Sequence, residues 1–396
     1  LQNLNRFNLD FIGFSIDALT VNAQPASFTR SGQELTITPA QPIPAGQDFQ
    51  VEVTYHGIPE EIDSVAAPGR IGWIHDDDIS YVLSEPDGAA TFFPVNGHPL
   101  DKATYTFSIQ VPRPYAAAAN GILAGSQPAG DTVTYVWEQK QGMASYLALI
   151  AIDEFVIENQ TSPNGVPIRN YYSAGLDEEA RRPFARQGEM LAFFSDTFGP
   201  YPFDAYGALV LDTTVGTALE AQTLSLYGID QLDLDDLPLA EQLAAHELAH
   251  QWFGDSLSVA DWGDIWLNEG FATYAEGLWI EHTEGADALD TWVEGLLAYA
   301  QEYGDDMLPP GKPSADDLFN EGVYCRGGLT LHALRLQVGD RAFFDILKAY
   351  YDRFKGSQAR TADFIAVAQE VSGRDLAAFF QAWLYQPELP YLPGFE

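Results

Sequence analysis

The first part of the chain, up to about residue 155, alternates between apolar and polar positions with the two-residue period of half-buried strands. Its β-branched and aromatic runs are separated by Pro and Gly, and the clearest of them span residues 35–38, 49–55, 104–111 and 133–137. Residues 143–152 are apolar but too few to cross a bilayer, which predicts a buried strand. Several short strands at this spacing predict an all-β sandwich domain over residues 1–155.

The pattern then changes, because apolar positions recur every three or four residues, as they do on one face of a helix. A polar segment with Pro and Gly at residues 159–165 is expected to be a linker. Strands are predicted at residues 166–172 and 206–211, and helices at 176–198, 276–303 and, as a pair, 359–385. The sequence thus predicts a multi-domain protein, with a mostly helical α+β domain over residues 156–396 following the β domain.

Residues 244–255 read A-A-H-E-L-A-H-Q-W-F-G-D and contain the most specific chemistry in the chain. His246 and His250 are four residues apart, so both imidazoles leave the same face of a helix. Glu247 lies beside the first histidine, and Glu269 follows nineteen residues after the second. Two His, one Glu and an open fourth position are typical of a catalytic zinc site. The alternative is two surface histidines, but apolar neighbours on nearly every side predict a buried helix.

H-E-x-x-H followed at this distance by N-E-G-F-A resembles the gluzincin zinc aminopeptidases of the aminopeptidase N type. The resemblance implies an N-terminal saddle-like β sandwich, here expected to miss its first strands, and a thermolysin-like α+β catalytic domain. It also implies one zinc ion per chain, bound by His246, His250 and Glu269. The resemblance covers nearly the whole chain but only part of the family architecture, as in a short form that lacks the C-terminal helical domains.

The same resemblance implies hydrolysis of the N-terminal residue from peptides. Zinc lowers the pKa of a bound water in such sites, and Glu247 is expected to act as the general base. Y-C-R-G-G-L-T-L-H-A-L, which begins at Tyr324, is similar to the family's Y-x-K-G-A-x-x-L-H-x-L, with Arg326 in place of Lys. Tyr324 is therefore expected to stabilise the oxyanion. The alternative for Tyr324 is an interface tyrosine that is hydrogen-bonded to backbone.

Residues 215–224 occupy the place of the family's G-A-M-E-N segment, an edge strand that pairs with substrate backbone. Only Ala218 and Glu220 match, and Leu219 stands for Met. The resemblance implies that Ala218 and Leu219 contact substrate and that Glu220 binds its N-terminal ammonium. Glu85, in a Pro-containing turn, is expected to reach the same ammonium. The alternatives are an exposed edge-strand charge for Glu220 and a solvated carboxylate for Glu85. Ala221 replaces the family's Asn, which puts one hydrogen bond to substrate in doubt.

The chain carries 57 acidic and 19 basic residues, a formal net charge of −38. Such a surface repels nucleic acid and anionic membranes, so neither is expected as a partner. The charge favours cationic substrates or life at high salt, and solubility alone explains it equally well. With one cysteine, no intramolecular disulfide is possible. No transmembrane segment or signal peptide is visible, so we expect a soluble protein without resolving its compartment.

Two other functions remain open on the sequence alone. An endopeptidase would use the same zinc chemistry in an open cleft without an amine anchor. A non-catalytic peptide-binding relative would keep the fold without turnover, although every zinc ligand and the general base are present here. The expected partner in the favoured interpretation is a peptide with a free N-terminus.

Overall fold

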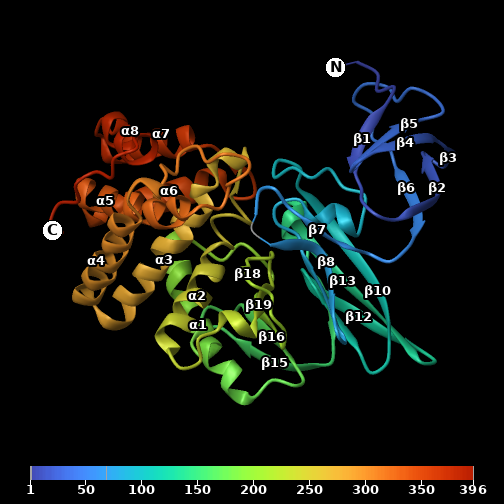
Figure 1. Ribbon diagram of the computed structural model, residues 1–396, viewed down its shortest axis with the longest axis horizontal. Coiled ribbons are helices and arrows are strands. Elements are labelled where there is room, and N and C mark those ends of the chain that lie inside the picture. The colour runs from blue at the N-terminus through green and yellow to red at the C-terminus, as the bar shows by residue number, and fades with distance from the viewer. Residues whose placement is uncertain (1, 68, 396) are drawn as a thin grey trace.

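A computed structural model describes residues 2–67 and 69–395 and places a small β sandwich apart from the helical part (Figure 1). Its two antiparallel sheets have the orders β1-β5-β4 and β3-β2-β6 and enclose a separate core that includes Phe11, Leu35 and Ile37. The six strands are β1 (Phe7–Asp10), β2 (Ser15–Val21), β3 (Gln24–Pro25), β4 (Ser27–Ser31), β5 (Glu34–Thr38) and β6 (Val51–His56). Of these six, the sequence pattern predicted only β5 and β6.

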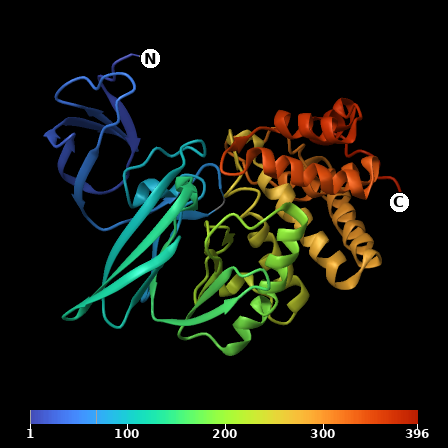
Figure 2. The same ribbon diagram turned by 180° about the vertical axis from the view of Figure 1, so that it is seen from behind.

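A second β unit follows, with a five-stranded sheet of order β11-β14-β9-β8-β7 and a long three-stranded sheet of order β10-β13-β12, teal in Figure 2. The predicted strand at residues 143–152 is wrong in its extent, because a 3-10 turn at Ser145–Leu147 separates β13 from β14. The strands are β7 (Glu61–Asp63), β8 (Arg70–Asp76), β9 (Ile79–Leu83), β10 (Ala103–Pro112), β11 (Ala116–Ala119), β12 (Ile122–Ala129), β13 (Thr132–Met143) and β14 (Ile150–Asp153).

A third sheet, of order β15-β16-β17-β19-β18, supports the helices. The predicted linker at residues 159–165 is mostly strand and turn instead, because Thr161 pairs with Pro167 across a hairpin. The short strand β18 lies at the edge of the sheet, antiparallel to β19, so its outer side is free to pair. The strands are β15 (Phe155–Thr161), β16 (Pro167–Ser173), β17 (Ala208–Leu211), β18 (Ala218–Leu219) and β19 (Ser225–Gly228).

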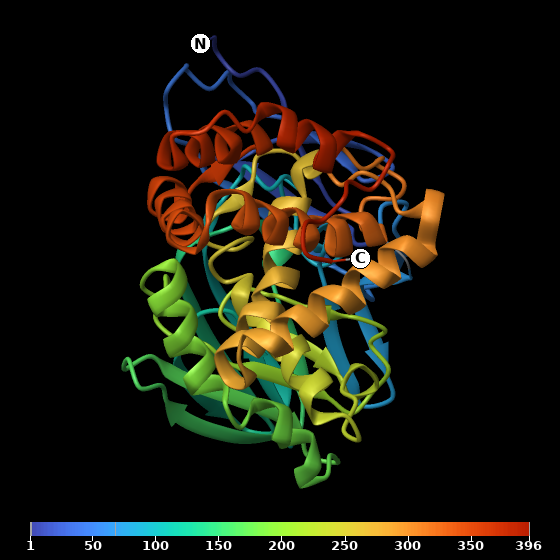
Figure 3. The same cartoon turned by 90° about the vertical axis from the view of Figure 1, so that its left-hand side faces the viewer.

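The helices form the remainder of the fold, and the last four, orange-red to red in Figure 3, gather at one side of it. The predicted helix at 276–303 is two helices, because Gly285 takes a φ of 97° between them. The predicted helix at 176–198 is likewise interrupted after a 3-10 segment, Glu178–Phe184. The helices are α1 (Gln187–Phe198), α2 (Leu237–Ala249), α3 (Trp266–Glu284), α4 (Ala286–Tyr303), α5 (Gly327–Val338), α6 (Asp340–Phe354), α7 (Thr361–Ser372) and α8 (Ala377–Tyr385).

The second β unit and the third sheet share one hydrophobic core, to which Val82, Leu149 and Leu226 all belong. Hydrogen bonds also connect the second β unit to the helical part of the chain. The part-buried Lys102 ammonium donates to the carbonyls of Asp255 and Ser256 at 2.7 and 2.8 Å. The segment that leads into β10 is therefore held against the loop that follows α2. Of the described helices, none combines the length and the apolar character needed to cross a bilayer.

Candidate active site

Two helices that pack against each other, α2 and α3, position His246, His250 and Glu269, which could together hold a metal ion. The Asp236 carboxylate caps the N-terminus of α2 by accepting from the Leu239 N–H at 3.3 Å, and Pro238 lies in the first turn. These signals start the helix so that His246 lies in its last turn and His250 directly follows it. Glu269 lies in the first turn of α3.

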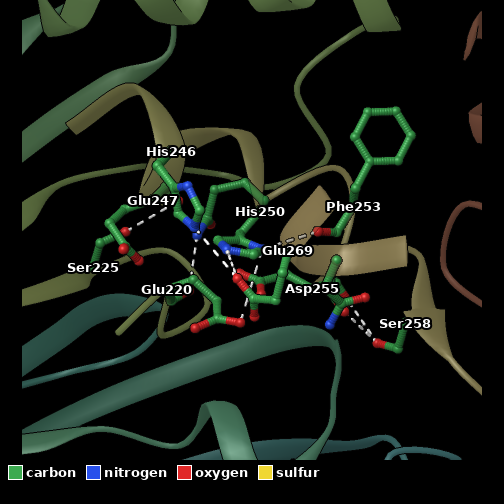
Figure 4. A network of polar contacts seen from close by, with 12 residues as sticks. Glu220, Ser225, His246, Glu247, His250, Phe253, Asp255, Ser258 and Glu269 are labelled. Atoms are coloured by element: carbon green, nitrogen blue, oxygen red, sulfur yellow. Dashed lines mark hydrogen bonds and ion pairs between the residues drawn. The ribbon is translucent and has the colours of Figure 1, made fainter. Parts of the chain in front are cut away.

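The three side chains converge on one point (Figure 4). Nε2 of His246 and Nε2 of His250 each lie 3.4 Å from Oε2 of Glu269. All three residues are buried, with 8%, 1% and 3% of their surface exposed. Burial works against ionisation of Glu269, but the imidazoles of His250 and His246 lower its pKa to about 2. An ionised carboxylate and two imidazole nitrogens face the same small space.

The remaining imidazole nitrogens fix which tautomer each histidine adopts. Nδ1 of His246 lies 2.7 Å from Oε1 of Glu276, and Nδ1 of His250 lies 3.1 Å from the carbonyl oxygen of Phe253. Both partners accept hydrogen bonds, so each Nδ1 carries a proton, and each Nε2 can offer its lone pair to a metal ion once its own proton is lost. This donor set fits a zinc ion, because zinc takes neutral imidazole and carboxylate ligands.

Glu247 lies next to this set and is 5% exposed. In the described part of the chain its Oε2 atom is buried without a hydrogen-bond partner. Burial raises its pKa to about 8, although the charges of His246 and His250 oppose that shift. A carboxyl group with a free oxygen and a pKa near neutrality is suited to accept and return a proton.

Tyr324 also lies at the site, where the centroid of its ring is 6.2 Å from that of the His246 imidazole, at an interplanar angle of 22°. Burial raises the pKa of its phenol well above the usual value, and the charge of Glu269 adds to the shift. Tyr324 therefore stays protonated and can donate a hydrogen bond. This satisfies the chemical requirement for stabilising an oxyanion.

Glu220 follows the edge strand β18, and Glu85 follows β9, so two separate sheets bring these carboxylates to the ligand cluster. One oxygen each of Glu85, Glu220 and Glu269 lie within 4.8 Å of one another. Oε1 of Glu85 and Oε1 of Glu220 are buried, and no described residue hydrogen-bonds to them. Burial raises the pKa of both groups, and for Glu85 the charge of Glu220 raises it further.

A cavity of about 430 Å³ connects these groups. All nine residues singled out from the sequence line it, namely Glu85, Ala218, Leu219, Glu220, His246, Glu247, His250, Glu269 and Tyr324. The structure therefore brings together every predicted site residue, from segments as far apart as the loop after β9 and the turn before α5. Their roles remain predictions that activity measurements must test.

Two supporting residues were missed. Glu276 holds His246, and its signal was its place seven residues after Glu269, two turns along the same face of α3. Gln251 directly follows His250; its amide donates to the carbonyl of Glu220 at 3.1 Å and accepts from the Thr223 N–H at 2.8 Å. Gln251 thus ties the Glu220 segment to the metal-ligating helix, and no sequence spacing indicates this contact.

Comparisons with known proteins agree with this geometry. The family model described as Peptidase family M1 domain matches residues 183–383, and the one described as Peptidase M1 N-terminal domain matches residues 4–147. Neither model covers residues 148–182, so the domain boundary expected at residue 155 stays a prediction.

Two curated relatives illustrate the similarity. Aminopeptidase N of Streptomyces lividans is 29% identical over 340 residues, which cover 78% of this chain and 38% of that protein. Glutamyl aminopeptidase of Homo sapiens is 27% identical over 328 residues, which cover 78% of this chain and 34% of that protein. The chain thus spans well under half the length of these relatives.

Solved structures match over a larger share. An M1 zinc metallopeptidase mutant from Deinococcus radiodurans, bound to a Tyr-Ser-Ala substrate, has a TM-score of 0.90 and 31% identity, and the match covers 99% of this chain and 89% of that chain. A two-domain M1 zinc metallopeptidase mutant bound to L-arginine has a TM-score of 0.88, with the same identity and coverage. These matches confirm the expected fold class, a β domain followed by a helical catalytic domain, and the chain belongs to peptidase family M1.

Proposed function

We propose that this protein is a zinc aminopeptidase that removes the N-terminal residue from peptides with a free amino end. The observation that carries the proposal is a pair of buried carboxylate oxygens, one on Glu220 and one on Glu85, that accept no hydrogen bond from the described residues and lie in the same cavity as the metal ligands. Nδ1 of His250 lies 3.9 Å from Oε1 of Glu220, which is an ion-pair distance but too long for a hydrogen bond. A buried carboxylate without a partner is costly, and a substrate ammonium supplies the missing charge and hydrogen bonds.

Each of the site residues has a separate role in the proposed reaction. His246, His250 and Glu269 hold the zinc ion, which supplies a Lewis acid that makes water nucleophilic near neutral pH. Glu247 accepts the proton of the attacking water and later delivers one to the leaving amine. Tyr324 donates a hydrogen bond to the carbonyl oxygen as negative charge develops on it, a contribution typically worth about 3 kcal/mol.

The substrate is positioned by its backbone and by its amino end. The free edge of β18 presents Ala218 and Leu219 to an extended peptide, which adds to the sheet as a further strand. Glu220 comes directly after this edge, so the ammonium is anchored beside the first peptide bond. A peptide whose chain continued past that point would meet two buried carboxylates instead of open space, which restricts cleavage to the first residue.

Relatives support this assignment. The similar protein from Deinococcus radiodurans was solved with a tripeptide substrate, and the Streptomyces lividans relative is named as an aminopeptidase. An endopeptidase with the same zinc chemistry is the main alternative. It would gain no benefit from a buried pair of carboxylates that stand next to the metal ligands, and no other observation favours it.

The decisive experiment compares a free-amine peptide amide with its N-acetylated form in the wild-type enzyme, Glu220→Ala and Glu294→Gln. Glu294 is an exposed carboxylate on α4 outside the cavity and serves as the matched control. We expect Glu220→Ala to lower kcat/KM for the free-amine substrate by about 10²-fold or more, because the ammonium loses its charged partner in a partly dry site. The acetylated substrate should be cleaved poorly by all three proteins.

Equal losses on both substrates would assign Glu220 a structural role and favour the endopeptidase. Efficient cleavage of the acetylated peptide by the wild-type protein would overturn the aminopeptidase proposal itself. A loss of similar size in Glu294→Gln would mean that the overall charge of the protein, rather than this one contact, determines the rate.

A further inference from the structure

The segment that carries Tyr324 is a π-helical turn, Gly322–Arg326 (η7), placed directly before α5. Such turns are rare and are often found at functional sites. Each one inserts one extra residue, so side chains before it are rotated by about 100° relative to an uninterrupted α-helix. The direction in which Tyr324 points therefore depends on whether this turn keeps its π-helical form.

The beginning of the turn is held by local contacts. The Gly322 N–H donates to Oδ1 of Asn320 at 3.0 Å, and the Val323 N–H donates to the carbonyl of the same residue at 3.0 Å. A side chain at Gly322 has no room, because a Cβ atom there would lie 2.1 Å from the carbonyl oxygen of Leu308. The backbone thus enters the turn in one position.

The end of the turn is held by Arg326, whose side chain has no exposed surface. Its Nε donates to the carbonyl of Trp383 at 2.7 Å, and its Nη atoms donate to four more carbonyls. These four acceptors are Ala382 at 2.9 Å, Gln386 at 2.6 Å, Pro387 at 3.1 Å and Glu388 at 3.2 Å. All five belong to the end of α8 or to the segment that directly follows it.

This arrangement has a clear physical basis. The last carbonyls of a helix lack partners within the helix and carry partial negative charge, so a cation is favoured there. The planar guanidinium, with five N–H groups, can serve several of these acceptors at once, whereas a lysine ammonium has three. Among the described residues, no carboxylate lies within ion-pair distance of Arg326, so backbone carbonyls alone hold its charge.

We propose that Arg326 is a positioning residue for Tyr324: by fixing the end of the π turn against α8, it keeps the Tyr324 hydroxyl directed into the active-site cavity. Tyr324 lies two residues before this anchor and lines the cavity beside the zinc ligands. The inference rests on the proposed function, in which Tyr324 stabilises the oxyanion. When the anchor is weakened, the turn can relax toward α-helical register and carry the phenol away.

The test is a double-mutant cycle with Arg326→Lys and Tyr324→Phe, measured as kcat and KM on an aminoacyl amide. We expect Arg326→Lys alone to lower kcat about 10-fold with KM nearly unchanged, since Tyr324 acts in the transition state. On the Tyr324→Phe background the same substitution should change kcat less than about 2-fold, because residues acting through one group are not additive. Losses that multiply in the double variant would overturn the proposal.

Arg335→Lys is the matched control, because Arg335 is another buried arginine, on α5, but is anchored by Glu281 and Asp340. It should lower the melting temperature without a selective loss of kcat. A loss of kcat equal to that of Arg326→Lys would show that any weakening of α5 suffices, and would overturn the assignment.

A binding measurement separates positioning from general damage. Arg326→Lys should weaken binding of a phosphinic peptide that mimics the tetrahedral state about 10-fold, while binding of the product amino acid changes little. Equal weakening of both ligands would contradict the proposal. Should Arg326→Lys fail to fold, Asn320→Ala tests the other end of the turn and should show the same selective loss, absent on the Tyr324→Phe background.

The two levels of inference fail in different ways. Tyr324→Phe with wild-type kcat would remove Tyr324 from the proposed function, and the role of Arg326 with it. A large loss in Tyr324→Phe, combined with unchanged kcat in Arg326→Lys, would leave the proposed function in place and overturn the positioning role alone.

Discussion

The two ends of the cavity differ in how their polar groups are satisfied. At the metal end, Nδ1 of each histidine has its own hydrogen-bond partner, and Glu269 lies between their Nε2 atoms. At the amine end, Glu85 and Glu220 each leave a buried oxygen without a hydrogen-bond partner in the described part of the chain. In the proposed function, the metal end binds zinc and the amine end binds the ammonium group of the substrate.

This contrast explains how each end is held. The metal end comes from two helices that pack together and lie within residues 237–284, so its geometry is set before any substrate arrives. The amine end joins loops from two different sheets, tied to the metal end chiefly through Gln251. Substitutions at the two ends should therefore impair the enzyme in different ways, which activity and zinc content can distinguish.

The largest effect is expected from removing the metal. Purified protein should contain about one zinc per chain, because the three groups of described side chains that could hold a metal ion share members, and only His246, His250 and Glu269 combine two histidines with a carboxylate. A chelator should abolish turnover and added zinc should restore it, as followed by elemental analysis alongside activity. Full activity in metal-free protein would contradict the assignment of the metal end.

The next largest effect should come from Glu247→Gln. The amide keeps the shape of the side chain but cannot accept a proton, so kcat should fall by about 10³-fold while the zinc content stays near one. His246→Ala should instead lose the metal. If both variants lost zinc equally, Glu247 would belong to the ligand set rather than to proton transfer.

A smaller effect is expected from Glu276→Gln, because this residue acts on zinc only through His246. Loss of the charged acceptor should weaken zinc affinity by about 10- to 100-fold, measured by competition with a chromogenic chelator. Activity at saturating zinc should recover most of its wild-type value. An unchanged affinity would mean that the contact to Nδ1 is not needed to orient the imidazole.

The sequence predicted the metal end more fully than the amine end, because local sequence determines the first and packing between distant segments determines the second. His246, Glu247 and His250 lie on one helical turn, so their geometry follows from helix periodicity alone. The meeting of Glu85 with Glu220 depends on how two sheets share a core, which no local pattern encodes. Their placement was expected only through the family resemblance.

The prediction of the fold was also correct for some elements and wrong for others. Strands with clear alternation, such as β10 and β13, were located because one face is buried. The small strands β1 to β4 were missed, because most of their positions are exposed or half-buried and the alternation is weak. The stretch 276–303 is interrupted by three glycines, and the apolar pattern continues across all of them, so the pattern did not single out Gly285 as the helix break, although its φ of 97° suits glycine.

The smallest effect we expect is a preference for substrates with a cationic N-terminal side chain. Such a preference would show that negative charge acts throughout the cavity and not only at the amine end. No lysine or arginine of the described chain lines it, and its charged lining residues other than the two histidines are the carboxylates Glu85, Glu220, Glu247, Glu269, Glu276 and Glu321. Glu321 is exposed at this lining and has no role in the proposed reaction. A basic side chain enters this field with a favourable interaction, and an acidic one is repelled.

At low salt, kcat/KM should therefore be several-fold higher for an arginyl amide than for a glutamyl amide, with a leucyl amide between them. Raising the ionic strength from about 0.01 to 1 M shortens the screening length from about 30 to 3 Å, so a field effect should shrink markedly. Glu321→Gln should reduce the ratio of arginyl to glutamyl rates and leave the leucyl rate unchanged, whereas Glu294→Gln should alter none of them. A ratio that does not respond to salt would indicate direct contact with the side chain instead of a field. Equal rates on all three substrates would mean that the acidic composition serves solubility. The negative charge of the cavity would then act on the substrate only at Glu85 and Glu220.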